Sequence, residues 1–385
     1  MTVATTGLYE LPQHYRDLRE LVRQIAHERV APRAAEIDAS DQYPWDLRRL
    51  LAEHDILALP FAEEHGGTGT GTLMLQMAVE ELARASAAVA LILIVQELGT
   101  LPIRLFGDDE QKQRFLPRCA SGEWSPAFCL SEADAGSDPA AMQCSARRDG
   151  DEWVIDGTKS WITNAGIADF YVVFAVTDRD QRRSTAFVVE SDRPGLSIPK
   201  FEHKLGIHGS PTGTPVFDGV RVPDRNRIGG VGRGLAIALA TLERSRLGVA
   251  AQAVGIAQGA TDHATGYATE RLAFGKPIIE LQAIQFKLAD MQTSIAAARE
   301  LLYKACVLAD SGDATAPMYS SMAKLFASDT AMAVTVEAVQ VLGGYGYTGE
   351  YPVERMMRDA KVTQIYEGTN EIQRLVIARQ MRGRG

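Results

Sequence analysis

A carboxylate near the C-terminus is the side chain in this sequence most suited to chemistry. Glu367 lies in the segment 358–374, where it follows Tyr366 and precedes Gly368 and Thr369. A positioned carboxylate can take a proton from a substrate as a general base. In most proteins, a Glu followed by Gly is instead a solvated carboxylate near a helix end. The interpretation of Glu367 therefore depends on the other segments that carry chemistry.

Several of these segments are suited to binding phosphate. Ser131 and Ser137 lie in the segment 128–138, whose amides and hydroxyls can bind phosphate oxygens without adding charge. The planar guanidinium of Arg271 suits a diphosphate. The glycine pair 343–344 allows the main chain to approach a ligand closely. Each has an ordinary structural alternative: a polar turn for the serines, a surface position for the Arg and a helix stop for the glycines.

The elements that must position these residues fall into three parts. A chain of 385 residues exceeds the usual limit of a single core, so two or three domains are expected. Helical spacing of apolar residues predominates up to about residue 130, short β-prone runs alternate with turns from there to about residue 227, and helical spacing then returns. We predict a helical domain over 1–124, a β domain over 125–233 and a helical domain over 234–385.

Composition excludes several classes of function. The net charge is −9 with no basic block, which argues against a nucleic-acid partner or an anionic membrane. The four cysteines form no metal-binding spacing, so no metal is expected and the thiols are expected to be reduced. Residues 1–6 lack the features of a leader, and the apolar run 85–95 is too short to span a bilayer and predicts a buried helix. A cytoplasmic protein is expected.

Six segments, in chain order, resemble the signatures of the acyl-CoA dehydrogenases, a family of FAD-dependent enzymes. They are 128–138, 159–164, 242–246, 271–277, 340–347 and 358–374. The resemblance covers nearly the whole chain. It implies an α+β fold with an N-terminal helical domain, a middle β-barrel or sandwich domain and a C-terminal four-helix bundle.

The resemblance also assigns residues to the cofactor FAD. In the family, the Trp-Ile-Thr tripeptide packs against the isoalloxazine ring, although Trp161 alone would be read as a core aromatic. The Arg of the Arg-x-x-Phe-Gly motif binds the FAD pyrophosphate of a neighbouring subunit, which implies a homotetramer built as a dimer of dimers. The implied FAD contacts are Phe128, Leu130, Ser131, Gly136, Ser137, Trp161, Ile162, Thr163, Arg271, Phe274, Gln282, Gln340, Gly343, Gly344, Thr369 and Glu371.

For the substrate, the resemblance makes Glu367 the catalytic base that removes the proton α to a thioester carbonyl. Isovaleryl-type members carry their base at the position of Ser245, which cannot serve. Many members have Asp where this chain has Glu243, so that contact departs from the family pattern. The implied acyl-CoA contacts are Ser137, Glu243, Arg246, Tyr366, Gly368 and Arg374.

The implied reaction is α,β-dehydrogenation of a short- or branched-chain acyl-CoA to the trans-2-enoyl-CoA, with an electron-transfer flavoprotein as electron acceptor. We expect Leu91, Ile92, Leu93 and Ile94 to floor a shallow acyl pocket, unless they only pack the helical core. Relatives with the same fold leave other chemistry open: oxidation of an acyl group on a carrier protein, or reactions like those of flavin monooxygenases and nitroalkane oxidases. A binding protein without FAD or a catalytically inactive scaffold is the alternative from another class.

Overall fold

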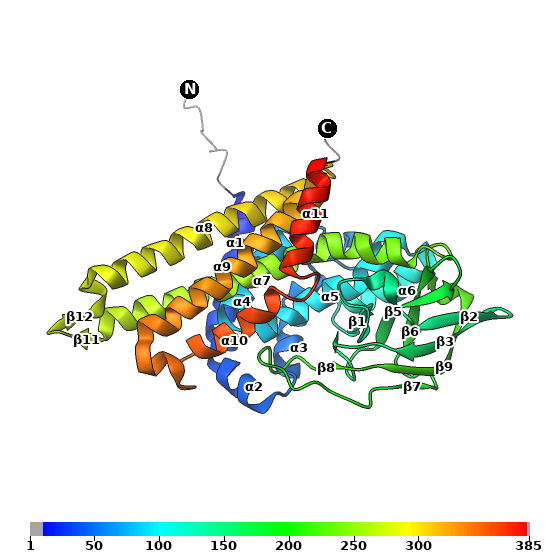
Figure 1. The fold of residues 1–385 in the computed structure, drawn as a ribbon, viewed down its shortest axis with the longest axis horizontal. Coiled ribbons are helices and arrows are strands. Elements are labelled where there is room, and N and C mark those ends of the chain that lie inside the picture. Colours follow the sequence, from blue (N-terminus) through cyan, green and yellow to red (C-terminus); the bar gives the residue numbers. More distant parts are fainter. Residues whose placement is uncertain (1–10, 383–385) are drawn as a thin grey trace, which may run out of the picture.

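The computed structural model describes residues 11–382 and has the predicted order of helices, strands and helices (Figure 1). Residues 1–6, from which no leader was expected, lie outside the described part. The strands between residues 126 and 228 form one end of the molecule, and the long C-terminal helices extend to the other end, where the short hairpin 272–277 lies (Figure 1). The predicted fold class is confirmed by this arrangement.

The N-terminal part is helical, and polar caps begin two of its helices. The Ser86 hydroxyl accepts a hydrogen bond from the Val89 N–H and begins α5, while Asp108 and Gln111 form a reciprocal capping box at the start of α6. A π-helical turn, η1 (Ala26–Val30), continues the first helix. The helices are α1 (Gln13–Ile25), α2 (Ala34–Ser40), α3 (Trp45–Glu53), α4 (Gly71–Ala85), α5 (Ala87–Phe106) and α6 (Asp109–Ala120).

The buried helix predicted from the apolar run 85–95 is α5, but it extends to 20 residues. By length and composition alone, α5 and the segment Ala316–Tyr347 could each cross a membrane. In their most apolar windows, 78% of the α5 residues and 44% of the Ala316–Tyr347 residues are buried inside the fold. The burial of α5 is what a core helix of a folded domain shows, and α5 packs against α4, α6 and α7.

The middle part is a mixed eight-stranded sheet that curls over its own core. One apolar cluster joins Val173 and Phe187 of the β5–β6 pair to Ile155 and Val220 of the β3–β9 pair. The opposite face of β5 and β6 packs against α6 and α7. The strands are β1 (Pro126–Cys129), β2 (Ser145–Asp149), β3 (Glu152–Thr158), β4 (Ile162–Thr163), β5 (Phe170–Asp178), β6 (Arg183–Glu190), β7 (Leu196–Ser197), β8 (Thr212–Gly213), β9 (Val216–Pro223) and β10 (Arg227–Ile228). In the sheet they run β10-β6-β5-β2-β3-β9-β7, with β1 beside β5 and a separate β4–β8 pair.

The C-terminal part consists of three long helices with two shorter ones packed against them. Glycines bring α7 close to α4: a Cβ at Gly255 would lie 2.3 Å from the Glu80 carbonyl oxygen, and one at Gly259 equally close to the Arg84 carbonyl oxygen. The elements are α7 (Gly234–Glu270), β11 (Leu272–Ala273), β12 (Lys276–Pro277), α8 (Gln282–Asp310), α9 (Ala316–Leu342), η8 (Gly343–Tyr347), α10 (Val353–Thr363) and α11 (Asn370–Arg382).

Candidate active site

A cleft of about 460 Å³ lies where the three parts of the fold meet. Its walls come from α5, from the loop after β1, from the segment around β4, and from α7 and α11. It brings together twelve of the residues that the sequence singled out, although they are dispersed over some 240 positions. These residues are Phe128, Leu130, Ser131, Gly136, Ser137, Trp161, Ile162, Thr163, Arg246, Tyr366, Glu367 and Gly368.

Glu367 reaches the cleft from a strained turn between α10 and α11. Glu367 has φ +53° and Gly368 has φ +91°, so a non-glycine residue is held in the left-handed region. The buried Gln373 side chain donates hydrogen bonds to the carbonyl oxygens of both residues, at 3.2 and 2.9 Å. The Tyr366 hydroxyl donates to the side-chain oxygen of Gln252. These contacts fix the main chain on both sides of the carboxylate.

The carboxylate of Glu367 is held from α7 and faces two buried cations. Ser245 Oγ donates a hydrogen bond to Glu367 Oε2 at 2.5 Å. Burial raises the pKa of Glu367 to about 7, against the lowering effects of this hydrogen bond and of the Arg246 and Lys324 charges. Burial also lowers the pKa of Arg246, opposed by the Glu367 and Glu243 carboxylates beside it. A carboxylate with a pKa near neutrality is a stronger base than one in water.

This pKa predicts the pH dependence of turnover. A base has to be ionised, so kcat/KM is expected to fall as the pH drops below about 7. The hydrogen bond from Ser245 stabilises the ionised carboxylate, and Ser245→Ala is therefore expected to move this acid limb to higher pH. Initial rates of the two proteins between pH 5 and 9 would check the expectation; acid limbs that superimpose would contradict it.

The opposite wall of the cleft presents a flat surface with hydroxyls around it. Trp161 is 54% exposed, a large exposure for an indole, and its φ is +59°. Ile162 and Thr163 follow in β4, where pairing with β8 holds them. A Cβ added at Gly136 would meet nothing within 4 Å. An exposed indole next to hydroxyls and open main chain fits a planar ring system such as isoalloxazine.

Arg271 lies at a second hollow, at the end of α7. Its guanidinium carbon is 5.6 Å from the centre of the Tyr345 ring, and it forms no ion pair with any carboxylate among residues 11–382. Gly343 and Gly344 line the same hollow and have open space where a Cβ would be. A free guanidinium beside exposed main chain fits a phosphate-bearing ligand.

Other predicted contacts lie away from the cleft within one protomer. Phe274 is 91% exposed at the tip of the β11–β12 hairpin, and Arg374 pairs with Asp329. Burial raises the pKa of Glu243, which lies on α7 one turn before the cleft residue Arg246. None of the following lines the cleft, so their roles stay predictions: Glu243, Phe274, Gln282, Gln340, Thr369, Glu371 and Arg374.

Two of the four residues expected to floor the acyl pocket line the cleft, and their role there stays a prediction. Leu91 and Ile94 line the cleft, whereas Ile92 and Leu93 are buried on other faces of α5, because a helix turns consecutive residues in different directions. Other apolar side chains that line the cleft were not among the residues singled out from the sequence, although Leu242 and Ile372 lie in two of the six segments. These side chains are Val95, Leu98, Leu235, Leu239, Leu242, Ile372, Leu375 and Val376.

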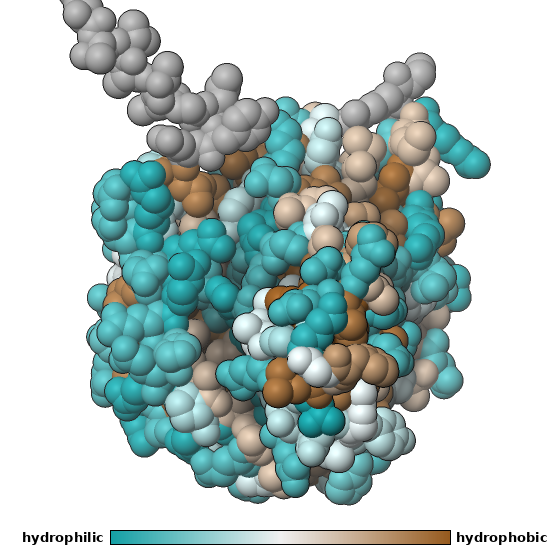
Figure 2. Space-filling model, turned by 90° about the vertical axis from the view of Figure 1, so that its left-hand side faces the viewer, coloured by the Kyte–Doolittle hydropathy of each residue, from teal (hydrophilic) through white to brown (hydrophobic). Residues whose placement is uncertain are grey.

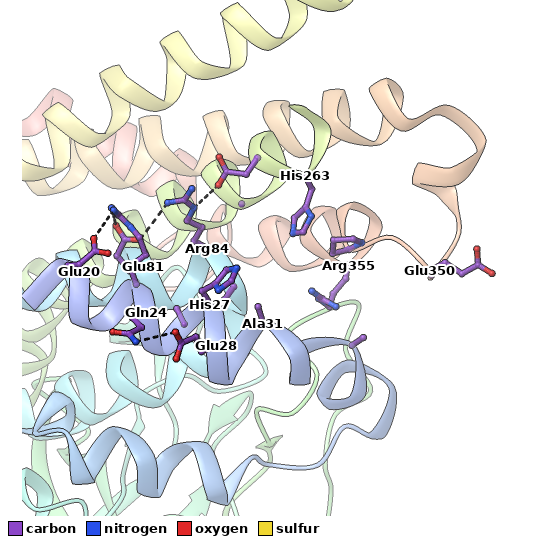
Figure 3. Close-up of a pocket in the computed structure, with 18 residues that line it drawn as sticks. Glu20, Gln24, His27, Glu28, Ala31, Glu81, Arg84, His263, Glu350 and Arg355 are labelled. Atoms are coloured by element: carbon purple, nitrogen blue, oxygen red, sulfur yellow. Dashed lines mark hydrogen bonds and ion pairs between the residues drawn. The ribbon is translucent and has the colours of Figure 1, made fainter. Parts of the chain in front are cut away.

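A larger hollow, of about 810 Å³, lies between α1, η1, α4, α7 and the start of α10 (Figure 3). Several polar groups are paired along its walls: Arg84 forms ion pairs with Asp262 and Glu81, and the Gln24 amide donates a hydrogen bond to Glu28 (Figure 3). It contains none of the catalytic, cofactor or substrate residues predicted from the sequence. The smaller cleft is therefore the candidate active site, because it holds Glu367 together with eleven other candidate residues.

Three family models match this chain in the order of its three parts. Residues 12–123 match the acyl-CoA dehydrogenase N-terminal domain, residues 127–220 the middle domain and residues 232–382 the C-terminal domain. This chain belongs to the acyl-CoA dehydrogenase family. The family and the enzyme class that the sequence predicted are thereby confirmed.

Curated relatives within this family match the chain over almost its full length. It is 45% identical to an acyl-CoA dehydrogenase of Bacillus subtilis (strain 168), over 95% of this chain and 97% of the relative. It is 43% identical to a short-chain specific acyl-CoA dehydrogenase of Clostridium acetobutylicum, over 96% and 98%. It is 47% identical to a cyclohex-1-ene-1-carbonyl-CoA dehydrogenase of Geobacter metallireducens, over 94% and 96%.

Solved structures of two dehydrogenases and one carrier-protein oxidase have the same fold. Butyryl-CoA dehydrogenase from Megasphaera elsdenii matches with a TM-score of 0.95 at 42% identity, over 97% of this chain and 99% of that one. An acyl-CoA dehydrogenase from Bacillus anthracis complexed with FAD matches at 0.91 and 32%, over 97% and 69%. The prolyl acyl carrier protein oxidase AnaB matches at 0.93 and 28%, over 97% and 100%. The prediction of FAD as the cofactor is confirmed by this family membership.

Proposed function

We propose that this enzyme dehydrogenates a short- or branched-chain acyl-CoA to the trans-2-enoyl-CoA, with Glu367 as the base. The observation that carries the proposal is the Glu367 carboxylate itself. It is held at 2.5 Å from Ser245 in a left-handed turn, its pKa is raised by burial to about 7, and it lines a cleft with apolar walls. An ordinary solvated Glu has none of these features.

In this reaction Glu367 takes the proton from the α carbon of the thioester. The α C–H is a weak acid, so the negative charge that develops on the thioester oxygen needs a hydrogen-bond donor. The main-chain N–H of Glu367 donates no hydrogen bond to any acceptor among residues 11–382, so it is available for this oxygen. Glu367 would then act twice on one thioester: its carboxylate would remove the α proton, and its main-chain N–H would stabilise the charge on the oxygen.

When bound, FAD supplies the redox chemistry by accepting the hydride from the β carbon. Trp161, Ile162 and Thr163 would hold its ring system, and Ser131 and Ser137 would offer hydroxyls to it. We propose an electron-transfer flavoprotein as the partner that then takes the electrons away, with the enzyme in the cytoplasm.

We also propose that the enzyme is a homotetramer in which Arg271 binds the FAD of a neighbouring subunit. The end of the molecule that bears the β11–β12 hairpin exposes apolar side chains among hydrophilic ones (Figure 2). Leu272, Phe274 and Phe286 are 63%, 91% and 59% exposed. Such a concentration of exposed apolar surface is typical of a subunit interface.

The dependence of kcat/KM on acyl-chain length tests the proposed substrate class. Leu91 and Ile94 are bulky apolar side chains that line the cleft. We therefore expect kcat/KM to be highest for butyryl-, branched short-chain or hexanoyl-CoA. Each buried methylene contributes about 0.8 kcal/mol, so chains that cannot be accommodated should lose at least about 100-fold. An anaerobic titration of the holoenzyme with a panel of acyl-CoAs, followed by bleaching of the flavin absorbance, measures it. A preference for dodecanoyl-CoA would show that the pocket is deep.

The second candidate is oxidation of an acyl group on a carrier protein, favoured by the likeness to AnaB. The same titration with butyryl-pantetheine on an acyl carrier protein distinguishes the two. Anaerobic reduction of the flavin by butyryl-CoA supports the acyl-CoA assignment. Reduction only by the carrier-bound thioester would replace it, and reduction by neither would favour a monooxygenase-like or inactive relative.

A further inference from the structure

A buried lysine lies directly behind the turn that carries Glu367. Lys324 is on α9, and its side chain is 0% exposed. The face of α9 that surrounds it is made of small residues, including Ala323, Ala327 and Ser328, all fully buried. A charged residue in a stripe of Ala and Ser is expensive to bury unless specific partners compensate.

The hydrogen-bond partners of Lys324 lie in and directly after the turn that carries Glu367. Its Nζ donates to the Gly368 carbonyl oxygen at 2.9 Å and to Asn370 Oδ1 at 2.9 Å. Asn370, the first residue of α11, is itself held by Ser328 and by Asp329 of α9. Lys324 therefore links α9 to two residues that follow Glu367, namely Gly368 and Asn370. Helix α11, which begins at Asn370, packs against α9 (Figure 1).

The turn needs such support because its conformation is intrinsically unfavourable. A non-glycine residue in the left-handed region persists only when its surroundings determine it. The Gly368 carbonyl oxygen accepts hydrogen bonds from both Lys324 and Gln373, and these two hydrogen bonds hold the main chain of the turn. We propose that Lys324 is a positioning residue for Glu367, holding the left-handed turn through the Gly368 carbonyl and placing a positive charge behind the carboxylate.

The charge of Lys324 supports Glu367 as a base, in addition to the support that its hydrogen bonds give to the turn. It favours the ionised form of Glu367, as Ser245 and Arg246 do from α7. Burial lowers the pKa of Lys324 to about 8, opposed by the Glu367 charge. Three other charged groups act on Lys324: Arg246, Asp329 and Glu371. Glu97 of α5 lies near Glu367, and its pKa is raised by burial and by the Glu367 charge.

The inference rests on the proposed role of Glu367 and is tested on the FAD-loaded enzyme. Lys324→Met keeps the length of the side chain but removes the charge and the donors. We expect kcat to fall about 10- to 100-fold with little change in KM, because small displacements of a reacting group cost this much. The acid limb of kcat/KM should move to higher pH, since a cation that favours ionised Glu367 is gone. Flavin content should be unchanged.

A readout independent of activity is hydrogen exchange. Deuterium uptake by a peptide covering 364–373 should become faster in Lys324→Met, because the turn loses its link to α9. Lys324→Gln is uncharged but can still donate to the Gly368 carbonyl; it should recover part of kcat and slow exchange again, yet keep the displaced acid limb. Lys304→Met, at an exposed lysine of α8, is the matched control and should change nothing.

An acid limb and an exchange rate that match the wild-type enzyme in both Lys324 variants would overturn the inference, whatever happens to thermal stability. If Lys324→Met does not fold, the acid limb of Lys324→Gln decides alone. A Glu367→Gln variant separates the two claims. If it retains turnover, the proposed function fails while exchange still reports on the turn; if it is inactive and Lys324→Met is normal, only the inference fails.

Discussion

Glu367→Gln is expected to reduce kcat by about 10²–10⁴, because removing a general base typically costs this much. Gln has nearly the shape of Glu and can still accept the hydrogen bond from Ser245 Oγ, so the turn should persist. FAD content and acyl-CoA binding should therefore stay close to those of the wild-type enzyme. Anaerobic stopped-flow reduction of the flavin by butyryl-CoA measures the loss directly. A variant with more than a third of wild-type turnover would refute the assignment.

A second substitution in the same background makes the test sharper. Ser245 Oγ lies 2.5 Å from a carboxylate oxygen of Glu367, so a carboxylate placed at 245 can reach nearly the same part of the cleft. The double variant Glu367→Gln/Ser245→Glu is expected to recover about ten-fold over Glu367→Gln alone, a fraction of the full effect of a base. Recovery would show that the defect is the missing base and not a disordered turn.

Arg271→Ala is expected to weaken FAD retention by about 10- to 100-fold, since a hydrogen bond to a charged group contributes about 1.5–3 kcal/mol. Arg271 has no ion-pair partner among residues 11–382, so within the protomer its loss removes the contact with the Tyr345 ring but no ion pair. If the ligand belongs to a neighbouring subunit, tetramer stability should fall together with FAD content. The flavin-to-protein ratio after gel filtration and the mass from light scattering measure both.

Two further variants control this experiment. Arg271→Lys keeps the charge but loses the planar fork, and it should retain FAD to an intermediate degree. Arg16→Ala removes an exposed arginine of α1 and should have no effect on either measurement. A monomeric holoenzyme with its full complement of FAD would contradict the role given to Arg271.

The sequence predicted the fold well where local patterns are strong. The switch from helical spacing to short β runs and back located the three parts, and the buried α5 was correctly inferred from one apolar run. Local patterns were less informative about which side chains of a buried helix face the cleft. Of the four consecutive residues 91–94, only Leu91 and Ile94 face the cleft, because the orientation of a buried helix depends on its neighbours on every side.

By itself, the sequence predicted the family and the cofactor and singled out Glu367 as the candidate base, because each of the six segments is a short run of neighbouring side chains. Only the tertiary structure identified the partners of that carboxylate. Ser245 is 122 positions from Glu367, and Lys324 is 44 positions from the carbonyl it holds. Ser245 lies in the segment 242–246 and Lys324 in none of the six segments, and only helix packing brings them to the turn. The pKa of Glu367 is likewise a tertiary property, because burial by elements far apart in the sequence raises it to about 7.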